Sequence, residues 1–303
     1  MKILITGADG QLAKAIVKSK PANMELIALK KSDLNLIDAN KTKNIIREIR
    51  PNWIINCGAY TNVEKSEKES DLAMKINAES IKAISESLKL TKGNLLHISS
   101  DFVFDGKKGS PYEPYDKLCP LGIYGKSKAK GEQYINQILG GLNQGIILRT
   151  SWLIGAEGKN FLNTMLKLHQ TKKQINVVTD QIGCITSTNN LANACWEIVK
   201  KKSKIRDINN KQVHIFHYCE SGVTSWYDVA VAIGEIGLEL KLINKIAKIN
   251  PIKTIDFPFQ VERPLFSLLD CEISKKSLNL KHIHWRFTLR ELIKEIKQKG
   301  HNR

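Results

Sequence analysis

Lys2-Ile-Leu-Ile-Thr6 is a short apolar run, and Gly7-Ala-Asp-Gly10-Gln-Leu-Ala13 follows it directly. This order predicts a buried strand that turns on glycines into a helix, as in a βαβ unit that holds a pyrophosphate. Gly7 permits the tight turn, and Gly10 lets backbone N–H groups approach the phosphates at the positive end of the helix. We therefore expect a dinucleotide site here; the alternative is a plain strand-turn-helix.

The first half of the chain alternates between strand-like and helix-like patterns. Near-continuously apolar strands indicate a parallel sheet that helices cover on both faces. The sequence therefore predicts an α/β fold, with a Rossmann-like doubly wound parallel sheet over residues 1–151. Its further strands are expected at Glu25–Leu29, Trp53–Cys57, Asn94–Ser100 and Gly145–Ser151, and its helices at Asn40–Arg50, Leu72–Leu90 and Tyr124–Leu139.

In the second half of the chain, strand-like and helix-like segments alternate less regularly. Residues 152–303 are expected to form mainly a smaller α/β substrate-binding lobe, with some segments returning to the first domain, and the ligand site is expected between the lobes. Prolines such as Pro251 indicate irregular segments, and Thr288 is expected to cap the last helix. Helices are expected at Phe161–Lys172, Asn189–Lys202, Thr224–Ile236 and Thr288–Gln298, and strands at Asn176–Thr179 and His214–Cys219.

The composition narrows the class of protein. The net charge is +17, but the lysines are spread along the 303 residues without interleaved aromatics, so we expect no nucleic-acid partner. No apolar stretch approaches the roughly 20 residues that span a bilayer, and we expect that the first residues are not a signal peptide. The six cysteines form no C-x-x-C pair, which argues against zinc and agrees with a reducing cytoplasm.

Tyr124 and Lys128 lie four residues apart at the start of a predicted helix and so share one face of it. An ammonium beside a phenol is expected to lower the pKa of the phenol, which could then act as a general acid toward a carbonyl. Ser100 and Asp101 end the fourth predicted strand, where a hydroxyl could bind the same carbonyl. Each pattern has a simpler explanation, namely a solvated helix turn and a capped strand end. Together with the glycine turn they favour hydride transfer.

The end of the second predicted strand bears on the choice of cofactor. A carboxylate at this position usually binds the adenosine ribose, whereas a basic residue accommodates a 2′-phosphate. Here Lys30 and Lys31 follow the strand. The cofactor is therefore expected to be NADPH, or either NADPH or NADH; the alternative is that both lysines are merely solvated.

Taken together, these residues resemble the extended short-chain dehydrogenase/reductase family, and within it the dTDP-4-dehydrorhamnose reductases. The similarity covers nearly the whole chain. Several motifs in the family's order carry it: Thr6-Gly-Ala-Asp-Gly-Gln-Leu12, Pro51-Asn-Trp-Ile-Ile-Asn56 with Ala59-Tyr-Thr61, Ser99-Ser-Asp-Phe-Val-Phe-Asp-Gly106, Pro120-Leu-Gly-Ile-Tyr-Gly-Lys-Ser-Lys128, Leu148-Arg-Thr-Ser-Trp152, Asp180-Gln-Ile-Gly183 and Arg263-Pro264.

The resemblance implies a reaction in which Tyr124 protonates the C4 keto oxygen of dTDP-4-dehydro-β-L-rhamnose while C4 takes hydride from NADPH or NADH. Lys128 would bind the nicotinamide ribose, and Ser100 would act with them. The implied cofactor contacts are Gly7, Gly10, Gln11, Leu12, Lys30, Asp38, Ala39, Ala59, Tyr60, Thr61, Tyr124 and Lys128. The implied substrate contacts are Ser100, Asp101, Trp152 and Arg263.

Departures from the family's pattern affect the expected assembly. Some members dimerise around a magnesium ion held by carboxylates, whereas this chain has Ala15, Asn189 and Asn190 in those regions, so we expect no metal. A homodimer stays one alternative. Two other functions also stay open: a ketoreductase or epimerase of another nucleotide-linked deoxysugar, and a non-catalytic binding subunit of the same fold.

Overall fold

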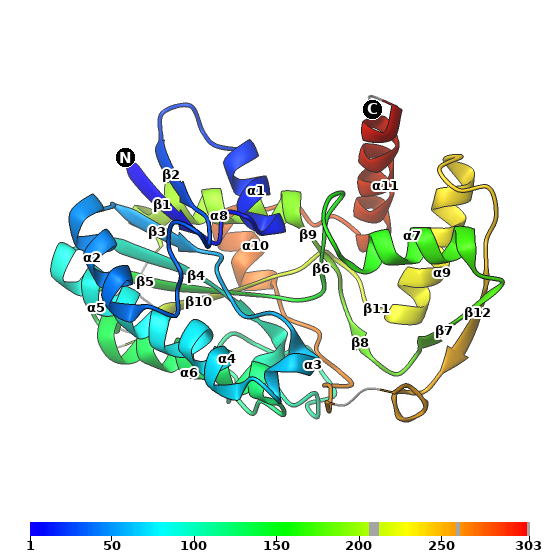
Figure 1. The fold of residues 1–303 in the computed structure, drawn as a ribbon, viewed down its shortest axis with the longest axis horizontal. Helices are drawn as coiled ribbons and strands as arrows, with labels where there is room; N and C mark the ends of the chain where they lie inside the picture. The colour runs from blue at the N-terminus through cyan, green and yellow to red at the C-terminus, as the bar shows by residue number, and fades with distance from the viewer. Residues whose placement is uncertain (206–211, 259–260, 302–303) are drawn as a thin grey trace.

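Six parallel strands form the central sheet of the computed structural model, which describes residues 1–205, 212–258 and 261–301 (Figure 1). The strand order is β10-β5-β4-β3-β1-β2. This confirms the predicted doubly wound parallel sheet, and it adds a sixth strand from beyond residue 151, since β10 pairs with β5. The strands are β1 Lys2–Thr6, β2 Glu25–Leu29, β3 Trp53–Asn56, β4 Asn94–Ser100, β5 Gly145–Thr150 and β10 His214–Tyr218.

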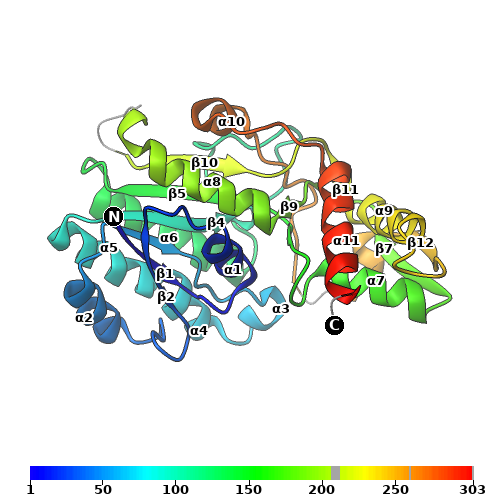
Figure 2. The same cartoon turned by 90° about the horizontal axis from the view of Figure 1, so that it is seen from above.

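Helices cover both faces of this sheet (Figure 2). One face packs on α2 Ala39–Ile49, α5 Ser80–Thr91 and α6 Ile123–Leu139. The other face packs on α1 Gln11–Lys18, α8 Thr188–Lys201 and α10 Glu272–Leu278. Successive side chains of each strand point alternately into the two cores, as expected for a sheet that is buried on both faces.

The predicted long helix at Leu72–Leu90 is interrupted. Its first part is α4 Ser70–Met74, and a π-helical turn at Lys75–Glu79 joins it to α5. Gly131 of α6 packs so closely here that a Cβ would lie 2.3 Å from the Asn77 carbonyl oxygen. Such single π turns often mark functional positions, and this one aims Asn77 at the loop after β3.

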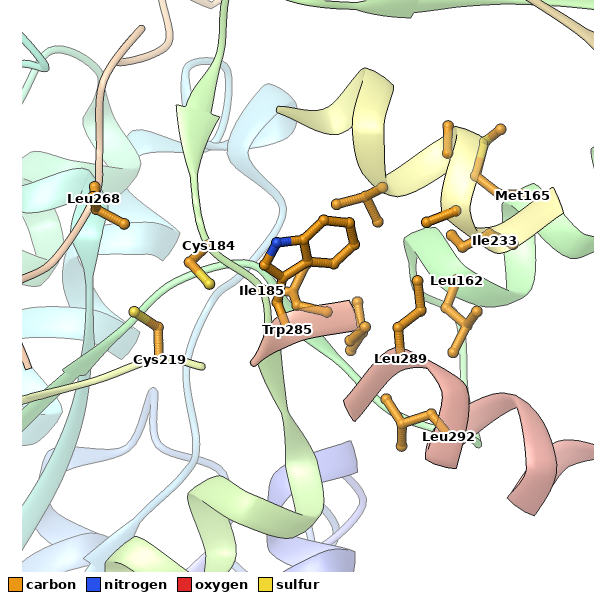
Figure 3. Packing of buried hydrophobic residues seen from close by; sticks show 14 of the residues in the cluster. Leu162, Met165, Cys184, Ile185, Cys219, Ile233, Leu268, Trp285, Leu289 and Leu292 are labelled. Atoms are coloured by element: carbon orange, nitrogen blue, oxygen red, sulfur yellow. The ribbon is translucent and has the colours of Figure 1, made fainter. Parts of the chain in front are cut away.

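In the part of the chain that the structure describes, three helices and three short strand pairs build the second lobe. The helices are α7 Phe161–Thr171, α9 Trp226–Glu239 and α11 Trp285–His301, and their apolar faces meet in a shared core (Figure 3). The strand pairs are β6 Leu153–Ile154 with β9 Thr186–Ser187, β7 Gln174–Val178 with β12 Lys248–Ile252, and β8 Ile182–Gly183 with β11 Thr224–Ser225. The remaining helical pieces are α3 Val63–Ser66 and the 3₁₀ turns Asp101–Val103, Lys202–Lys204 and Thr254–Asp256.

Two expectations for this lobe are wrong. Pro251 lies inside strand β12, not in an irregular segment, because a two-stranded pair leaves an outer edge where proline's missing N–H does no harm. Thr288 does not cap the last helix, since α11 begins at Trp285 and Thr288 is buried within its first turns. Within the described ranges, no helix has the length and apolar character that crossing a membrane requires.

Candidate active site

The glycine turn after β1 is closed against the end of β3. Gly7 has a φ of +67°, and a Cβ there would lie 2.7 Å from the Cα of Gly58. Gly10 stands at the N-terminal cap of α1, and its N–H donates to the Gly7 carbonyl at 2.9 Å. Only glycine fits at position 7. The turn thus has the shape that a pyrophosphate needs, and the opening amides of α1 are free of helical partners, as in any first turn.

Gln11 and Leu12 use their side chains elsewhere. The Asn160 amide of the second lobe donates to Gln11 Oε1 at 2.7 Å, so Gln11 links the two lobes. The side chain of Leu12 is buried in the core beneath the sheet. A contact of either residue with a phosphate would therefore be made by its backbone N–H.

The end of β2 presents an exposed turn. Lys30 and Lys31 are both exposed there, and the backbone N–H of Lys31 donates to Asp9 at 3.3 Å. Asp38 caps α2 by accepting from the Lys41 backbone N–H at 2.8 Å, which makes Ala39 the first residue of that helix. A contact of these residues with a dinucleotide stays a prediction.

The loop after β3 is held in place by a residue that the sequence analysis missed. Asn77 accepts from the Tyr60 backbone N–H at 2.8 Å, and its amide donates to the Tyr60 carbonyl and to Ser127. The Tyr60 hydroxyl donates to Glu69 at 2.6 Å. The loop Ala59–Thr61 is therefore fixed relative to α6, which also carries the catalytic candidates. An asparagine inside a predicted helix was the only signal.

Tyr124 and Lys128 share one face of α6, as the spacing predicts, but the expected effect on the phenol is wrong. Burial raises the pKa of Tyr124 to about 12; the Ser100 hydroxyl opposes this rise and the Asp101 carboxylate adds to it. The Lys128 amine instead donates to the Ile98 carbonyl at 2.7 Å. The phenol consequently keeps its proton at neutral pH, which is the state that a general acid requires.

Ser100 and Asp101 meet Tyr124 at the end of β4. Ser100 Oγ donates to Asp101 Oδ1 at 2.9 Å, and its oxygen accepts from the Phe102 backbone N–H at 3.2 Å. Both side chains are buried, and burial raises the pKa of Asp101 to about 6 against the hydrogen bonds of Ser267 and Ser100. The structure thus brings together the three side chains expected at a substrate carbonyl.

A buried ion pair behind the site was not predicted. The Arg149 guanidinium of β5 binds both carboxylate oxygens of Glu132, with its shortest contact at 2.7 Å, and Ser99 donates to the same carboxylate at 2.5 Å. Arg149 also donates to the Pro114 carbonyl and contacts His217. Both partners of the pair are at most 3% exposed. An arginine inside a strand expected to be buried on both faces was the available signal.

Trp152 belongs to an aromatic stack. The ring centroids of Trp152 and Trp226 lie 3.9 Å apart, with the two rings nearly parallel. The ring centroid of Phe161 lies 4.4 Å from that of Trp226. Trp152 has a φ of +46°, a left-handed conformation that is rare for a bulky residue and is often found at functional sites. The sequence analysis missed Trp226. It is the first residue of α9, directly after the capping residue Ser225.

Arg263 is engaged in an ion pair. Its guanidinium contacts Glu64 of α3 at 2.8 Å. Since α3 follows the Ala59–Thr61 loop, this pair joins that loop to the second lobe. Among the described residues, no three His, Cys, Asp or Glu side chains are grouped so as to hold a metal ion, and all six cysteines are free thiols.

Comparison with known proteins identifies the family. The family model described as "RmlD substrate binding domain" matches residues 1–298. The chain belongs to this family. The dTDP-4-dehydrorhamnose reductase of Aggregatibacter actinomycetemcomitans is 34% identical over 96% of this chain and 98% of that protein. The spore coat polysaccharide biosynthesis protein SpsK of Bacillus subtilis is 37% identical over 97% of each chain.

A solved structure from the same family agrees with the fold. The dTDP-4-dehydrorhamnose reductase of Bacillus anthracis, crystallised in complex with NADP, superposes with a TM-score of 0.87. It is 30% identical, and the match covers 97% of this chain and 99% of that one. The likeness therefore extends over both lobes and not only over the dinucleotide-binding sheet.

Proposed function

We propose that this chain reduces the C4 keto group of dTDP-4-dehydro-β-L-rhamnose to give dTDP-β-L-rhamnose, with hydride from NAD(P)H. One observation carries this proposal. The protonated Tyr124 phenol, the Ser100 hydroxyl and the Lys128 amine lie at the end of β4, in the sheet whose first strand carries the glycine turn. Full-length relatives of this chain are named dTDP-4-dehydrorhamnose reductases.

The residues would divide the work as follows. When bound, the reduced nicotinamide supplies the hydride that C4 receives. Tyr124 donates its proton to the keto oxygen, and the Ser100 hydroxyl, which donates to Asp101 in this structure, turns to donate to the same oxygen when the substrate binds. A charged Lys128 binds the nicotinamide ribose. Trp152 packs on the sugar ring, and Arg263 faces the diphosphate.

The cofactor is proposed to be NADPH in preference to NADH. The exposed lysines at the end of β2 are the support, since a cation there accommodates a 2′-phosphate. Replacing Lys30 with Glu is expected to raise the KM for NADPH by roughly tenfold and to leave the KM for NADH nearly unchanged. Steady-state kinetics with both cofactors measures this, with Lys20→Glu as a distant control. An equal change for both cofactors contradicts the proposal.

Absorbance at the nicotinamide band tests the reaction itself. With dTDP-4-dehydrorhamnose supplied, the wild-type chain is expected to oxidise NADPH, and Tyr124→Phe is expected to lose about 10²–10⁴-fold in kcat while it still binds NADPH. Other 4-keto nucleotide sugars are tested alongside. Faster turnover of one of these assigns a different deoxysugar, and tight NADPH binding without any turnover assigns a non-catalytic subunit.

We propose the cytoplasm as the compartment, with the six free thiols as support, because reducing conditions keep cysteines unpaired. A nucleotide sugar is the proposed ligand. The chain is proposed to act either as a monomer or as a homodimer. Size-exclusion chromatography with light scattering determines which of these two forms exists in solution.

A further inference from the structure

A row of buried polar side chains runs beneath the site, across three neighbouring strands. Thr6 of β1 pairs in register with Asn56 of β3, and Asn56 with His97 of β4. Lys128 reaches them from α6. All four are at most 2% exposed. Burying a polar group is unfavourable unless it has a hydrogen-bond partner. We therefore expect each of these four side chains to be hydrogen-bonded to its neighbour.

The contacts along this row are continuous. Thr6 Oγ1 lies 2.6 Å from Asn56 Oδ1, Asn56 Nδ2 lies 3.0 Å from His97 Nδ1, and His97 Nε2 lies 3.3 Å from Lys128 Nζ. Thr6 Oγ1 also accepts from the Gly58 backbone N–H at 3.2 Å. Gly58 is the residue that closes on the glycine turn, so the row joins the cofactor turn to the catalytic lysine.

Two arrangements of protons fit these atoms. In the first, Thr6 donates to Asn56, the Asn56 amide donates to His97 Nδ1, and the His97 Nε2–H donates to an uncharged Lys128. In the second, a charged Lys128 donates to His97 Nε2 and His97 Nδ1–H donates to Asn56. The turned amide then donates to Thr6 and gives up the 3.4 Å contact of its nitrogen with the Gly58 carbonyl. An ammonium has no lone pair, so only the second arrangement suits the charged lysine. His97 stays neutral in both, since burial and Lys128 hold its pKa well below the usual range.

We propose that His97 is a positioning residue for Lys128, and that its tautomer, set jointly with the Asn56 amide, follows the charge on that lysine. This rests on the proposed function, in which a charged Lys128 binds the nicotinamide ribose. In this proposal His97 does not touch the reacting atoms. It keeps the Lys128 amine in place and in its charged form.

Two side chains besides His97 act on the charge of Lys128. Burial lowers the pKa of Lys128 to about 8, whereas the Glu132 carboxylate from α6 and the Cys57 thiol after β3 oppose this fall. Tyr124, one turn before Lys128 on the same helix, is protonated in this pH range. A hydrogen bond accepted from the ammonium stabilises its charged form. Loss of the imidazole should therefore let the pKa of Lys128 fall further.

The kinetic test compares two variants of this residue over a range of pH. In the wild type, kcat/KM with NADPH is expected to fall as the pH rises through about 8, because Lys128 loses its proton. In His97→Leu this fall, the alkaline limb of the pH profile, should occur at a pH roughly one unit lower. The value of kcat should decrease, and KM should change less. His97→Gln keeps an amide oxygen that can accept from Lys128, and should largely restore both. His169→Gln, a buried histidine of the second lobe, is the control and should not move the limb.

A spectroscopic test needs no turnover. In the wild-type chain labelled with ¹⁵N-histidine, the protonated nitrogen of His97 should change from Nδ1 to Nε2 as the pH rises through the same range, assigned by comparison with His97→Gln. An unmoved alkaline limb in a folded His97→Leu, or a constant tautomer, overturns the proposal. If the chain reduces no 4-keto sugar, the proposed function fails, yet the tautomer measurement still decides the role of His97.

Discussion

On one side of the site lie charged and polar side chains that are almost fully buried, and on the other lie aromatic rings that stay partly exposed. The buried polar side comprises Thr6, Asn56, His97, Lys128, Glu132 and Arg149, each at most 3% exposed. The aromatic side comprises Trp152, Phe161 and Trp226. The first belongs to the sheet and α6, whereas the second belongs to the smaller lobe.

The difference teaches how the two tasks of the site are separated. Hydrogen bonds and ion pairs are directional, and a buried partner left alone is strongly unfavourable, so the polar side tolerates little change. Ring stacking is weaker and less directional, so the aromatic side can adapt to a ligand. We therefore expect changes on the polar side to affect folding and catalysis most, and changes on the aromatic side to affect mainly the binding of the sugar.

The largest effect is expected when the buried ion pair is broken. Arg149→Leu leaves the Glu132 carboxylate buried without its cation and should lower the free energy of unfolding by about 3–5 kcal/mol. Urea denaturation measures this change. Lys294→Ala removes the exposed pair with Glu291 and should change the free energy by less than about 1 kcal/mol. Equal changes in the free energy of unfolding for the two variants would show that the buried pair is no more important for stability than the exposed one.

A smaller effect is expected on the aromatic side. Trp226→Leu removes the ring on which Trp152 stacks and should raise the KM for the nucleotide sugar by roughly three- to tenfold, since such a pair contributes about 0.5–1.5 kcal/mol. The KM for NADPH should stay the same. Phe287→Leu, an exposed aromatic on α11 of the same lobe, is the control. A parallel rise in both KM values would show that Trp226 supports the whole site.

The smallest expected effect comes from Gly183. A Cβ there would lie 2.9 Å from Cε2 and Cζ2 of Trp152, so Gly183→Ala should shift the indole and raise the KM for the sugar by about twofold. Gly300→Ala, where a Cβ meets nothing within 4 Å, serves as the matched control. If Gly183→Ala leaves every kinetic constant unchanged, the position of Trp152 is less important than the stack suggests.

Much of the first lobe could be predicted because its signals are local. The apolar strands, the glycine turn and the four-residue spacing of Tyr124 and Lys128 are each contained in a short stretch of chain. The second lobe was predicted less well. The strand at Lys248–Ile252 contains Pro251 and pairs with a segment more than 70 residues earlier, so no local pattern announces it. The π-helical turn at Asn77 likewise packs closely against Gly131 of another helix, which no local pattern announces.

The sequence by itself determined the parallel sheet, its glycine turn and the helix face that carries the phenol and the amine, because periodicity and glycine geometry act over a few residues. Only the tertiary structure decided that the pKa of the Tyr124 phenol is raised, that Arg149 pairs with Glu132, and that His97 lies beside Lys128. The physical reason is that a pKa or a buried pairing depends on which distant segments exclude water from a group. That is determined only when strands far apart in the chain lie side by side.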